Sequence, residues 1–231
     1  MKKINTLLAA SVFAATAVSA SADSGSVTAN AGFVTDYYYR GLNLGDAGMY
    51  AGLDYELGGF SAGAWAINDN NDDIEGGNDG LEVDFYASYG FDVMGVDLGI
   101  GYTRYEYTYT SDYEAEVNLS ASYGAFTVDY ANGTAHEEET ADDDADYIFY
   151  SLNWSNDIFS ATWGHWEVDE PNIDVQYEYF EVSASGEFSG FDITATIGKT
   201  TDVVGVDEFT GEDLNSGDGY MVLDISKSFD L

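Results

Sequence analysis

The feature that most constrains this chain is a two-residue alternation of apolar and polar side chains. Residues 81–89 show it clearly, with Leu81, Val83, Phe85, Ala87 and Tyr89 alternating with Glu82, Asp84, Tyr86 and Ser88. Successive side chains of a β-strand point to opposite faces, so the pattern predicts strands with one apolar and one polar face. Stretches of this kind, about ten residues long, recur from residue 27 to the C-terminal end. After residue 22 we find no apolar stripe with a helical period, and we therefore predict an all-β fold.

The connections between these stretches alternate in length. Short connections are predicted at residues 58–59, 92–95, 124–125, 155–157 and 187–190. Longer and more polar connections are predicted at residues 40–47, 69–80, 108–112, 132–145, 167–176 and 200–219. Outer-membrane barrels have an even number of antiparallel strands, short periplasmic turns and longer outer loops. We therefore predict a closed antiparallel transmembrane β-barrel of about twelve strands, with both ends of the chain on the periplasmic side.

Closure of the sheet and the placement of aromatic side chains support this interpretation. Hydrocarbon cannot satisfy the free backbone groups of a sheet edge, so a sheet that spans a membrane must close. Aromatic residues at strand ends are typical of the girdles at the two membrane interfaces. The predicted girdle residues are Tyr37, Tyr39, Tyr55, Tyr102, Tyr123, Phe126, Trp154 and Phe229.

The last predicted strand, residues 221–229, has an apolar side directed at lipid. Leu223, Ile225 and Phe229 share this side, and we expect them to form the signal by which the strand engages the barrel-assembly machinery. Lys227 interrupts the apolar side near the periplasmic end, where a long side chain can extend its charged group to the interface.

The first 22 residues read as a signal peptide. Lys2 and Lys3 precede an apolar run from residue 4 to 18, and Ala20-Ser21-Ala22 resembles a cleavage site. We expect the barrel to comprise residues 23–231 and to be exported to the outer membrane of a Gram-negative bacterium. There it would contact outer-membrane lipid and lipopolysaccharide.

The charge of the chain excludes one class of partner. Its 231 residues include 43 Asp and Glu but only 6 Lys and Arg, for a formal net charge of -37. Nucleic-acid phosphates are bound through Lys and Arg, so we expect no nucleic-acid partner. The absence of cysteine excludes disulfides, zinc–thiolate sites and cysteine nucleophiles. We predict no cofactor.

Several segments carry a resemblance to a known family. They are VTDYYYRG at 34–41, GLDY at 52–55, FSAGAW at 60–65, EYFE at 178–181 and VLDISKSF at 222–229. In these segments the chain resembles the TorF-type porin family. The resemblance implies an outer-membrane β-barrel and passive passage of solutes, and it brings no catalytic residues. The chain departs from the family pattern in its greater acidity, which leaves the preferred solute open.

Polar-face residues are the candidates for the channel lumen and its constriction. The candidates are Arg40, Arg104, Asp54, Glu82, Asp84, Asp97, Glu116 and Asp192. We assign Arg40 and Arg104 to the polar face, near the outer ends of their strands. They could form a positively charged constriction in an acidic lumen. Alternatively, each could pair with carboxylates and hold neighbouring strands together.

Other candidate sites lack a required element. Asp69, Asn71 and Asp73 have the spacing of calcium ligands, but Ile74 replaces the required glycine and Gly80 the bidentate glutamate. We therefore predict no specific metal site and interpret this stretch, with the acidic runs 137–139 and 142–144, as a solvated outer rim, which leaves weak binding of divalent cations by the acidic loops open.

The chain also lacks a recognisable catalytic constellation. Neither His136 nor His165 accompanies a serine nucleophile motif. We predict that the protein is not an enzyme.

The sequence favours a porin that passes small hydrophilic solutes and prefers cations, because lumen carboxylates stabilise cations within a low-dielectric wall. Two alternatives remain open. Tyr50, Trp65, Tyr86 and Trp166 could fill a small barrel, leaving a structural or adhesive protein that conducts nothing. A secreted soluble β-sandwich would require the apolar faces to pair across a core. The solute, the oligomeric state and any inward folding of a loop are not determined by the sequence.

Overall fold

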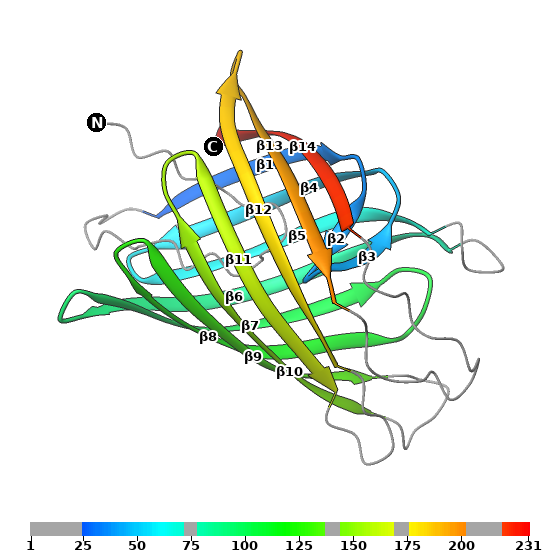
Figure 1. The fold of residues 1–231 in the computed structure, drawn as a ribbon, viewed down its shortest axis with the longest axis horizontal. Coiled ribbons are helices and arrows are strands. Elements are labelled where there is room, and N and C mark those ends of the chain that lie inside the picture. Colours follow the sequence, from blue (N-terminus) through cyan, green and yellow to red (C-terminus); the bar gives the residue numbers. More distant parts are fainter. Residues whose placement is uncertain (1–24, 72–77, 137–143, 169–175, 202–218) are drawn as a thin grey trace.

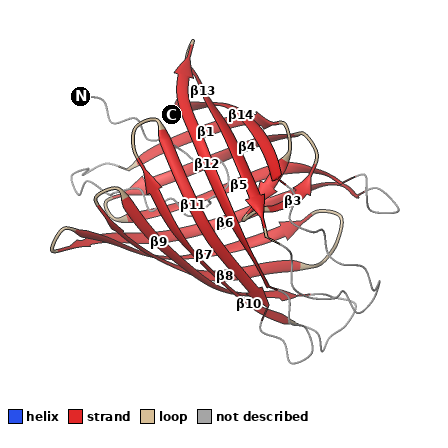
Figure 2. Ribbon diagram, in the orientation of Figure 1, coloured by secondary structure: helices blue, strands red, loops and turns tan. Residues whose placement is uncertain are grey.

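The strands close into a single barrel. The computed structural model describes residues 25–71, 78–136, 144–168, 176–201 and 219–231. Twelve of its strands form an antiparallel ring in which each strand pairs with its neighbours in the chain, and β14 (Gly219–Asp230) closes on β1 (Ser26–Val34) (Figures 1 and 2). The prediction of a closed antiparallel barrel of about twelve strands is confirmed.

The remaining barrel strands follow the predicted segments. They are β4 (Gly48–Leu57), β5 (Phe60–Asn71), β6 (Asn78–Val93), β7 (Val96–Tyr107), β8 (Tyr113–Tyr123), β9 (Phe126–His136), β10 (Ala145–Ser155), β11 (Phe159–Val168), β12 (Gln176–Phe188) and β13 (Phe191–Thr200). In the described part of the chain no helix is long and apolar enough to span a membrane. The predicted signal peptide lies outside the described residues.

The predicted alternation of connections gives the barrel two different ends. Tight turns join β4 to β5, β6 to β7, β8 to β9 and β12 to β13, and we call this the short-turn end. Gly58, Gly95, Gly124 and Gly190 have positive φ angles there, which glycine adopts without steric cost. The start of β1 pairs with the end of β14 at the same end of the barrel. The longer connections lie at the opposite, long-loop end.

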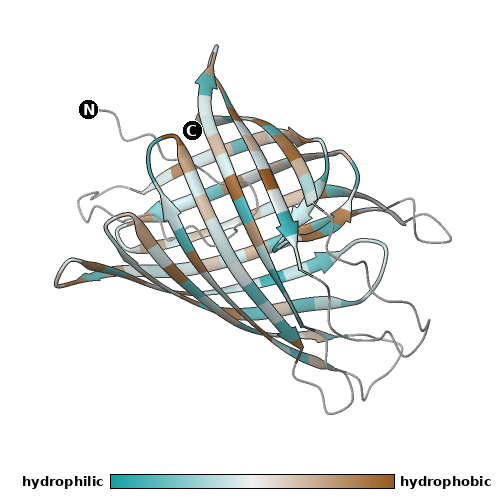
Figure 3. Ribbon diagram, in the orientation of Figure 1, coloured by the Kyte–Doolittle hydropathy of each residue, from teal (hydrophilic) through white to brown (hydrophobic). Residues whose placement is uncertain are grey.

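Figure 3 shows hydrophilic and hydrophobic residues alternating along the strands, and the large apolar side chains are the ones exposed on the exterior of the barrel. Phe85 is 51% exposed and Ile197 65% exposed, whereas their neighbours Asp84 and Gly198 are buried. Large apolar side chains of this kind are exposed on every barrel strand, far beyond the patches that soluble proteins tolerate. The exterior therefore suits contact with lipid better than contact with water.

Charged side chains on the exterior lie near the ends of the strands. At the long-loop end they are Arg104, Glu106, Asp146, Glu167, Glu178 and Lys199. Lys227 lies toward the short-turn end, 5.2 Å from the ring centre of Phe191 and 5.7 Å from that of Phe229. The middle of the outer wall therefore carries apolar residues, as contact with the hydrocarbon core of a membrane requires.

One pair of strands is not part of the barrel wall. β2 (Tyr37–Tyr39) and β3 (Leu42–Gly45) form a separate hairpin within the connection from β1 to β4. We call residues 37–45 the inward hairpin, because its side chains contact the inner wall. Tyr37 is 7% exposed and Tyr39 contacts Tyr105 inside the barrel, so the prediction that Tyr37 and Tyr39 belong to an aromatic girdle was wrong.

Candidate functional site: the lumen and its inward hairpin

The tip of the inward hairpin is a two-residue turn. Tyr39 pairs with Leu42, and both turn residues have positive φ angles, 48° at Arg40 and 83° at Gly41. Positive φ at both positions is the requirement of a type I′ turn. Glycine meets it readily, but arginine does so only when surrounding contacts hold it there.

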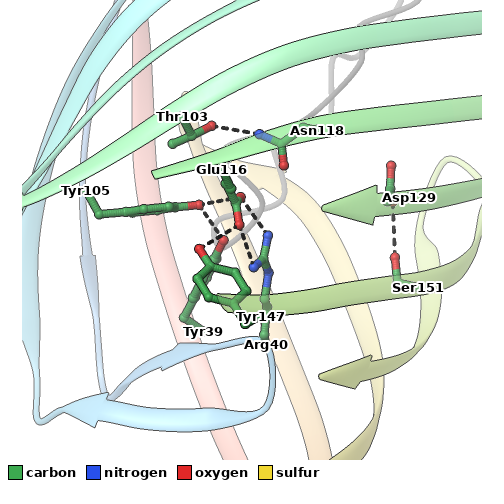
Figure 4. Close-up of polar contacts among 9 residues, drawn as sticks. All are labelled: Tyr39, Arg40, Thr103, Tyr105, Glu116, Asn118, Asp129, Tyr147 and Ser151. Carbon is green, nitrogen blue, oxygen red and sulfur yellow. Dashed lines mark hydrogen bonds and ion pairs between the residues drawn. The ribbon is translucent and has the colours of Figure 1, made fainter. Parts of the chain in front are cut away.

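Those contacts come from a carboxylate on the opposite wall. The Arg40 guanidinium donates from Nη1 and Nη2 to the two oxygens of Glu116 on β8, at 2.9 and 2.8 Å. Tyr105 and Tyr147 donate to the same carboxylate at 2.8 and 3.1 Å (Figure 4). Arg40 is 11% exposed and Glu116 2%, so this is a buried and well-satisfied ion pair.

Aromatic rings complete the surroundings of Arg40. Its guanidinium carbon lies 4.1 Å from the ring centre of Phe149 on β10 and 4.8 Å from that of Tyr39. Such contacts are favourable cation–π interactions in a desolvated setting. The hydroxyl groups of Tyr39 and Tyr105 lie 2.7 Å apart and form a hydrogen bond. The arginine is therefore held from several strands at once.

The base of the inward hairpin is tied to β6. Tyr37 donates a 2.9 Å hydrogen bond to Glu82, which lies two residues from the 1% exposed Asp84. Burial raises the pKa of Tyr37 well above its usual value, and the charges of Glu82 and Asp84 raise it further. The phenol therefore keeps its proton and remains a donor at physiological pH.

The hairpin also contacts the wall on its other side. Thr200 on β13 donates to the carbonyl of Gly41, and a Cβ at Gly41 would collide with Tyr179 of β12. The ring of Tyr38 stacks on that of Tyr220 of β14, with centres 3.9 Å apart. Contacts on β6, β8, β10, β12, β13 and β14 together mean that the inward hairpin spans the lumen.

The remaining lumen wall is acidic. Carboxylates on inward positions of the strands are Asp54, Glu82, Asp84, Asp97, Glu114, Glu116, Asp129, Glu181, Asp192 and Asp224. Of the arginines and lysines that the structure describes, Arg40 alone faces the lumen, and it is paired with Glu116. Among the described residues that face the lumen, acidic side chains therefore far outnumber basic ones.

The predicted lumen residues lie on the inner face, with one exception. Arg104 occupies the same face as the exposed Ile100 and Tyr102, while Thr103 and Tyr105 point inward. Its guanidinium pairs with Glu106 and lies 3.7 Å from the ring centre of Tyr113 on the exterior. The assignment of Arg104 to the polar face was wrong, because the register places it on the apolar parity of its strand.

The lumen carboxylates differ in their partners. Asp54 accepts hydrogen bonds from Tyr86 and from Asn30, the latter at 3.2 Å. Asp97 and Asp192 are inward residues near the short-turn end of β7 and β13. Only Glu116 is neutralised by a basic side chain among the described lumen residues.

The other predicted residues can also be placed. Leu223, Ile225 and Phe229 are exposed on the exterior of β14. His165 is buried on the outer side of the wall against the Tyr150 ring, 3.4 Å from Glu167. The side chains of the predicted calcium-like stretch 69–75 and the acidic residues 137–143 lie outside the described part of the structure.

Sequence reasoning missed the inward hairpin itself. The segment 35–47 was interpreted as strand followed by a long outer connection. The signal that could have indicated it is Arg40-Gly41 flanked by tyrosines, which combines a turn-forming glycine with side chains able to reach lumen carboxylates. The partners of the hairpin, the acceptors Glu116 and Glu82 and the donor Thr200, lie far away in sequence, so only the closed barrel reveals their proximity.

Comparison with known proteins supports the fold. A structure from a study of the in-meso crystallization of membrane proteins has a TM-score of 0.54 at 8% identity, covering 89% of this chain and 84% of that one. Pseudomonas aeruginosa OccK2 in complex with glucuronate has a TM-score of 0.41 at 11% identity, covering 81% of this chain and 59% of that one. Acinetobacter baumannii OccAB2 has a TM-score of 0.43 at 6% identity, covering 81% and 56%. The chain thus spans somewhat more than half of each Occ protein. No family model and no curated protein matches the sequence.

Proposed function

We propose that this protein is an outer-membrane channel that admits small hydrophilic solutes and prefers cations. The observation that supports the proposal most directly is the lumen charge, with many inward carboxylates and one basic side chain already paired with Glu116. In a low-dielectric wall such charges lower the energy of a cation and raise that of an anion. The lipid-compatible exterior supports the membrane location.

Single-channel recording tests this function. The mature chain, refolded in detergent and inserted into a planar bilayer, should conduct in KCl with a reversal potential that favours K⁺ across a salt gradient. A reversal potential that favours Cl⁻ would contradict the cation preference. Selectivity should weaken at high salt, because screening shortens the reach of the lumen charges.

A second candidate function is a barrel that stays closed at rest. The inward hairpin favours it, because contacts from Tyr37 to Gly41 bridge opposite walls. A protein without residues 37–45, with a short Gly-Ser linker in their place, separates the two functions. Conductance that appears only after this deletion supports a closed barrel, whereas conductance in both proteins supports the open channel.

Several further assignments accompany the proposal. Outer-membrane lipid and lipopolysaccharide would cover the exterior, and residues Leu223, Ile225 and Phe229 would engage the assembly machinery. The signal peptide 1–22 would direct export, and the TorF-type porin family is the proposed affiliation. Fractionation of the expressing cell, with N-terminal sequencing of the outer-membrane product, tests location and cleavage together.

A further inference from the structure

Apart from the main lumen, a smaller hollow lies beside the inward hairpin, next to β12, β13 and β14. We call it the side chamber and define it by three aromatic residues, Tyr38, Tyr50 and Trp65, and three acids, Asp36, Glu181 and Asp224. Its cavity volume is about 60 Å³, several times the roughly 10–15 Å³ that one water requires. The side chamber therefore has room for a small molecule.

Aromatic rings form part of its lining. The ring centres of Tyr50 and Trp65 lie 5.4 Å apart at an angle of 39°, so the two rings form a tilted pair. Tyr38 comes from the inward hairpin and is held by its stack on Tyr220. Rings supplied by β2, β4 and β5 thus meet at one hollow. Their π-electrons offer a favourable environment to a cation.

Among the described residues, the carboxylates of the side chamber have no basic partner. Asp224 accepts a 2.8 Å hydrogen bond from Tyr50, and Glu181 accepts one of 2.6 Å from Tyr220. Both donors are neutral phenols, which orient the carboxylates without cancelling their charge. The described residues of the lining include no Arg, Lys or His, and Arg40 is held by Glu116 elsewhere in the lumen.

We propose that the side chamber binds a small organic ammonium ion with an alkylated head, a ligand class that rests on the proposed cation-preferring function. Such an ion fits both the acidic and the aromatic residues of the lining, because its charge complements Glu181 and Asp224 while its methyl groups contact the rings. A neutral sugar would use the rings but would leave two carboxylate charges uncompensated. The charge balance therefore favours the ammonium ion.

Calorimetric titration of the folded protein in detergent tests this assignment without requiring conduction. Choline is the probe, and 3,3-dimethyl-1-butanol is its neutral carbon analogue of nearly the same shape. We expect choline to bind at least about tenfold more tightly than the neutral analogue, since a desolvated cation–π contact alone contributes about that factor. Equal binding of the two probes, or tighter binding of glucose than of choline, would overturn the proposal.

Matched variants assign the binding to the side chamber. Glu181→Gln and Asp224→Asn together remove both charges but keep a carbonyl acceptor for Tyr220 and Tyr50. We expect this double variant to lower choline affinity at least about tenfold. Asp97→Asn removes a lumen charge on β7, which does not line the side chamber, and should change the affinity less than about twofold. Equal effects of both variants would contradict a localised site.

The same proteins separate this proposal from the channel function. If the barrel conducts K⁺ selectively but choline neither binds nor reduces the current, the side chamber assignment fails and the channel function stands. If choline binds with the expected variant pattern while the bilayer shows no conductance, the channel function fails and the binding site stands. Circular dichroism and heat-dependent gel mobility confirm that each variant is folded.

Discussion

Two acidic residues of the lumen, Glu116 and Asp224, have hydrogen-bond partners of different kinds. On the side of β6 to β10, Glu116 receives two bonds from Arg40 and one each from Tyr105 and Tyr147. On the side of β12 to β14, the carboxylate of Asp224 accepts a hydrogen bond from the neutral phenol of Tyr50. A carboxylate paired with a buried guanidinium holds the structure together, whereas a phenol supplies a hydrogen bond without a compensating positive charge. Partner type, rather than burial, distinguishes the two roles.

The largest loss of stability is expected at Glu116, the carboxylate that Arg40 neutralises. Glu116→Gln leaves the Arg40 charge buried without a counter-ion and should lower the free energy of unfolding by about 3–5 kcal/mol. Asp224→Asn keeps the acceptor for Tyr50 and should lower it by less than about 1 kcal/mol. Urea unfolding of the folded barrel in detergent or lipid measures both. Similar losses of unfolding free energy in the two variants would contradict the distinction between Glu116 and Asp224.

A double variant sharpens the interpretation of that loss. Arg40→Met combined with Glu116→Leu removes both charges and should recover part of the stability lost in Glu116→Gln, since an apolar replacement often substitutes for a buried ion pair. Recovery should be incomplete, because the hydroxyl groups of Tyr105 and Tyr147 lose their acceptor. A double variant less stable than Glu116→Gln would contradict this account.

A smaller effect is expected at the turn of the inward hairpin. Gly41→Ala places a Cβ against Tyr179 at a φ of 83°, whereas Gly58→Ala introduces one at a φ of 60° with no neighbour within 4 Å. The left-handed conformation alone should cost each variant roughly 1–2 kcal/mol. The excess loss in Gly41→Ala then measures how tightly the hairpin tip is packed against β12. Equal losses would indicate a loosely seated hairpin.

The stack of Tyr38 on Tyr220 should have a still smaller effect. A double-mutant cycle with Tyr38→Leu and Tyr220→Leu should give a coupling free energy of about 0.5–1.5 kcal/mol, as for other aromatic pairs. Unfolding in urea provides the four free energies. Strictly additive losses would show that the hairpin does not depend on this contact with the side-chamber wall.

The smallest effect is expected outside the lumen. Arg104 lies on the exterior beside Glu106, so Arg104→Gln should change stability by no more than about 0.5 kcal/mol. It should leave the reversal potential of the channel unchanged, unlike a change at a lumen charge. A shift in ion selectivity from this variant would indicate that Arg104 contributes to the constriction after all.

The sequence predicted the fold well because the barrel repeats one local rule. Alternation along residues 81–89 identifies the inner and outer faces of β6 without any knowledge of its neighbours. Glycines at 58 and 124 mark turns that connect adjacent strands. Each of these signals lies within a few residues of what it predicts, so the strand count and the closed topology could be inferred directly.

The arrangement within the lumen could not be predicted in the same way. Arg40 and Glu116 are 76 residues apart, and Thr200 is 159 residues from Gly41. Such contacts depend on the closed register and on a connection that folds inward instead of outward. Arg104 shows a different limit of prediction from sequence. Its spacing of two residues from Tyr102 indicates the outer face of the strand, but its charge suggested the inner face. Polarity alone assigns a face poorly near the end of a strand.

The inward hairpin has a mechanical consequence for the barrel. A closed ring of strands resists opening but can still flatten from a circle toward an ellipse. The contact between Arg40 and β8 and that between Gly41 and β13 make the hairpin a strut between nearly opposite walls. Compression of the wall would therefore act directly on the ion pair, so the cross-section of the barrel is coupled to a single guanidinium–carboxylate contact.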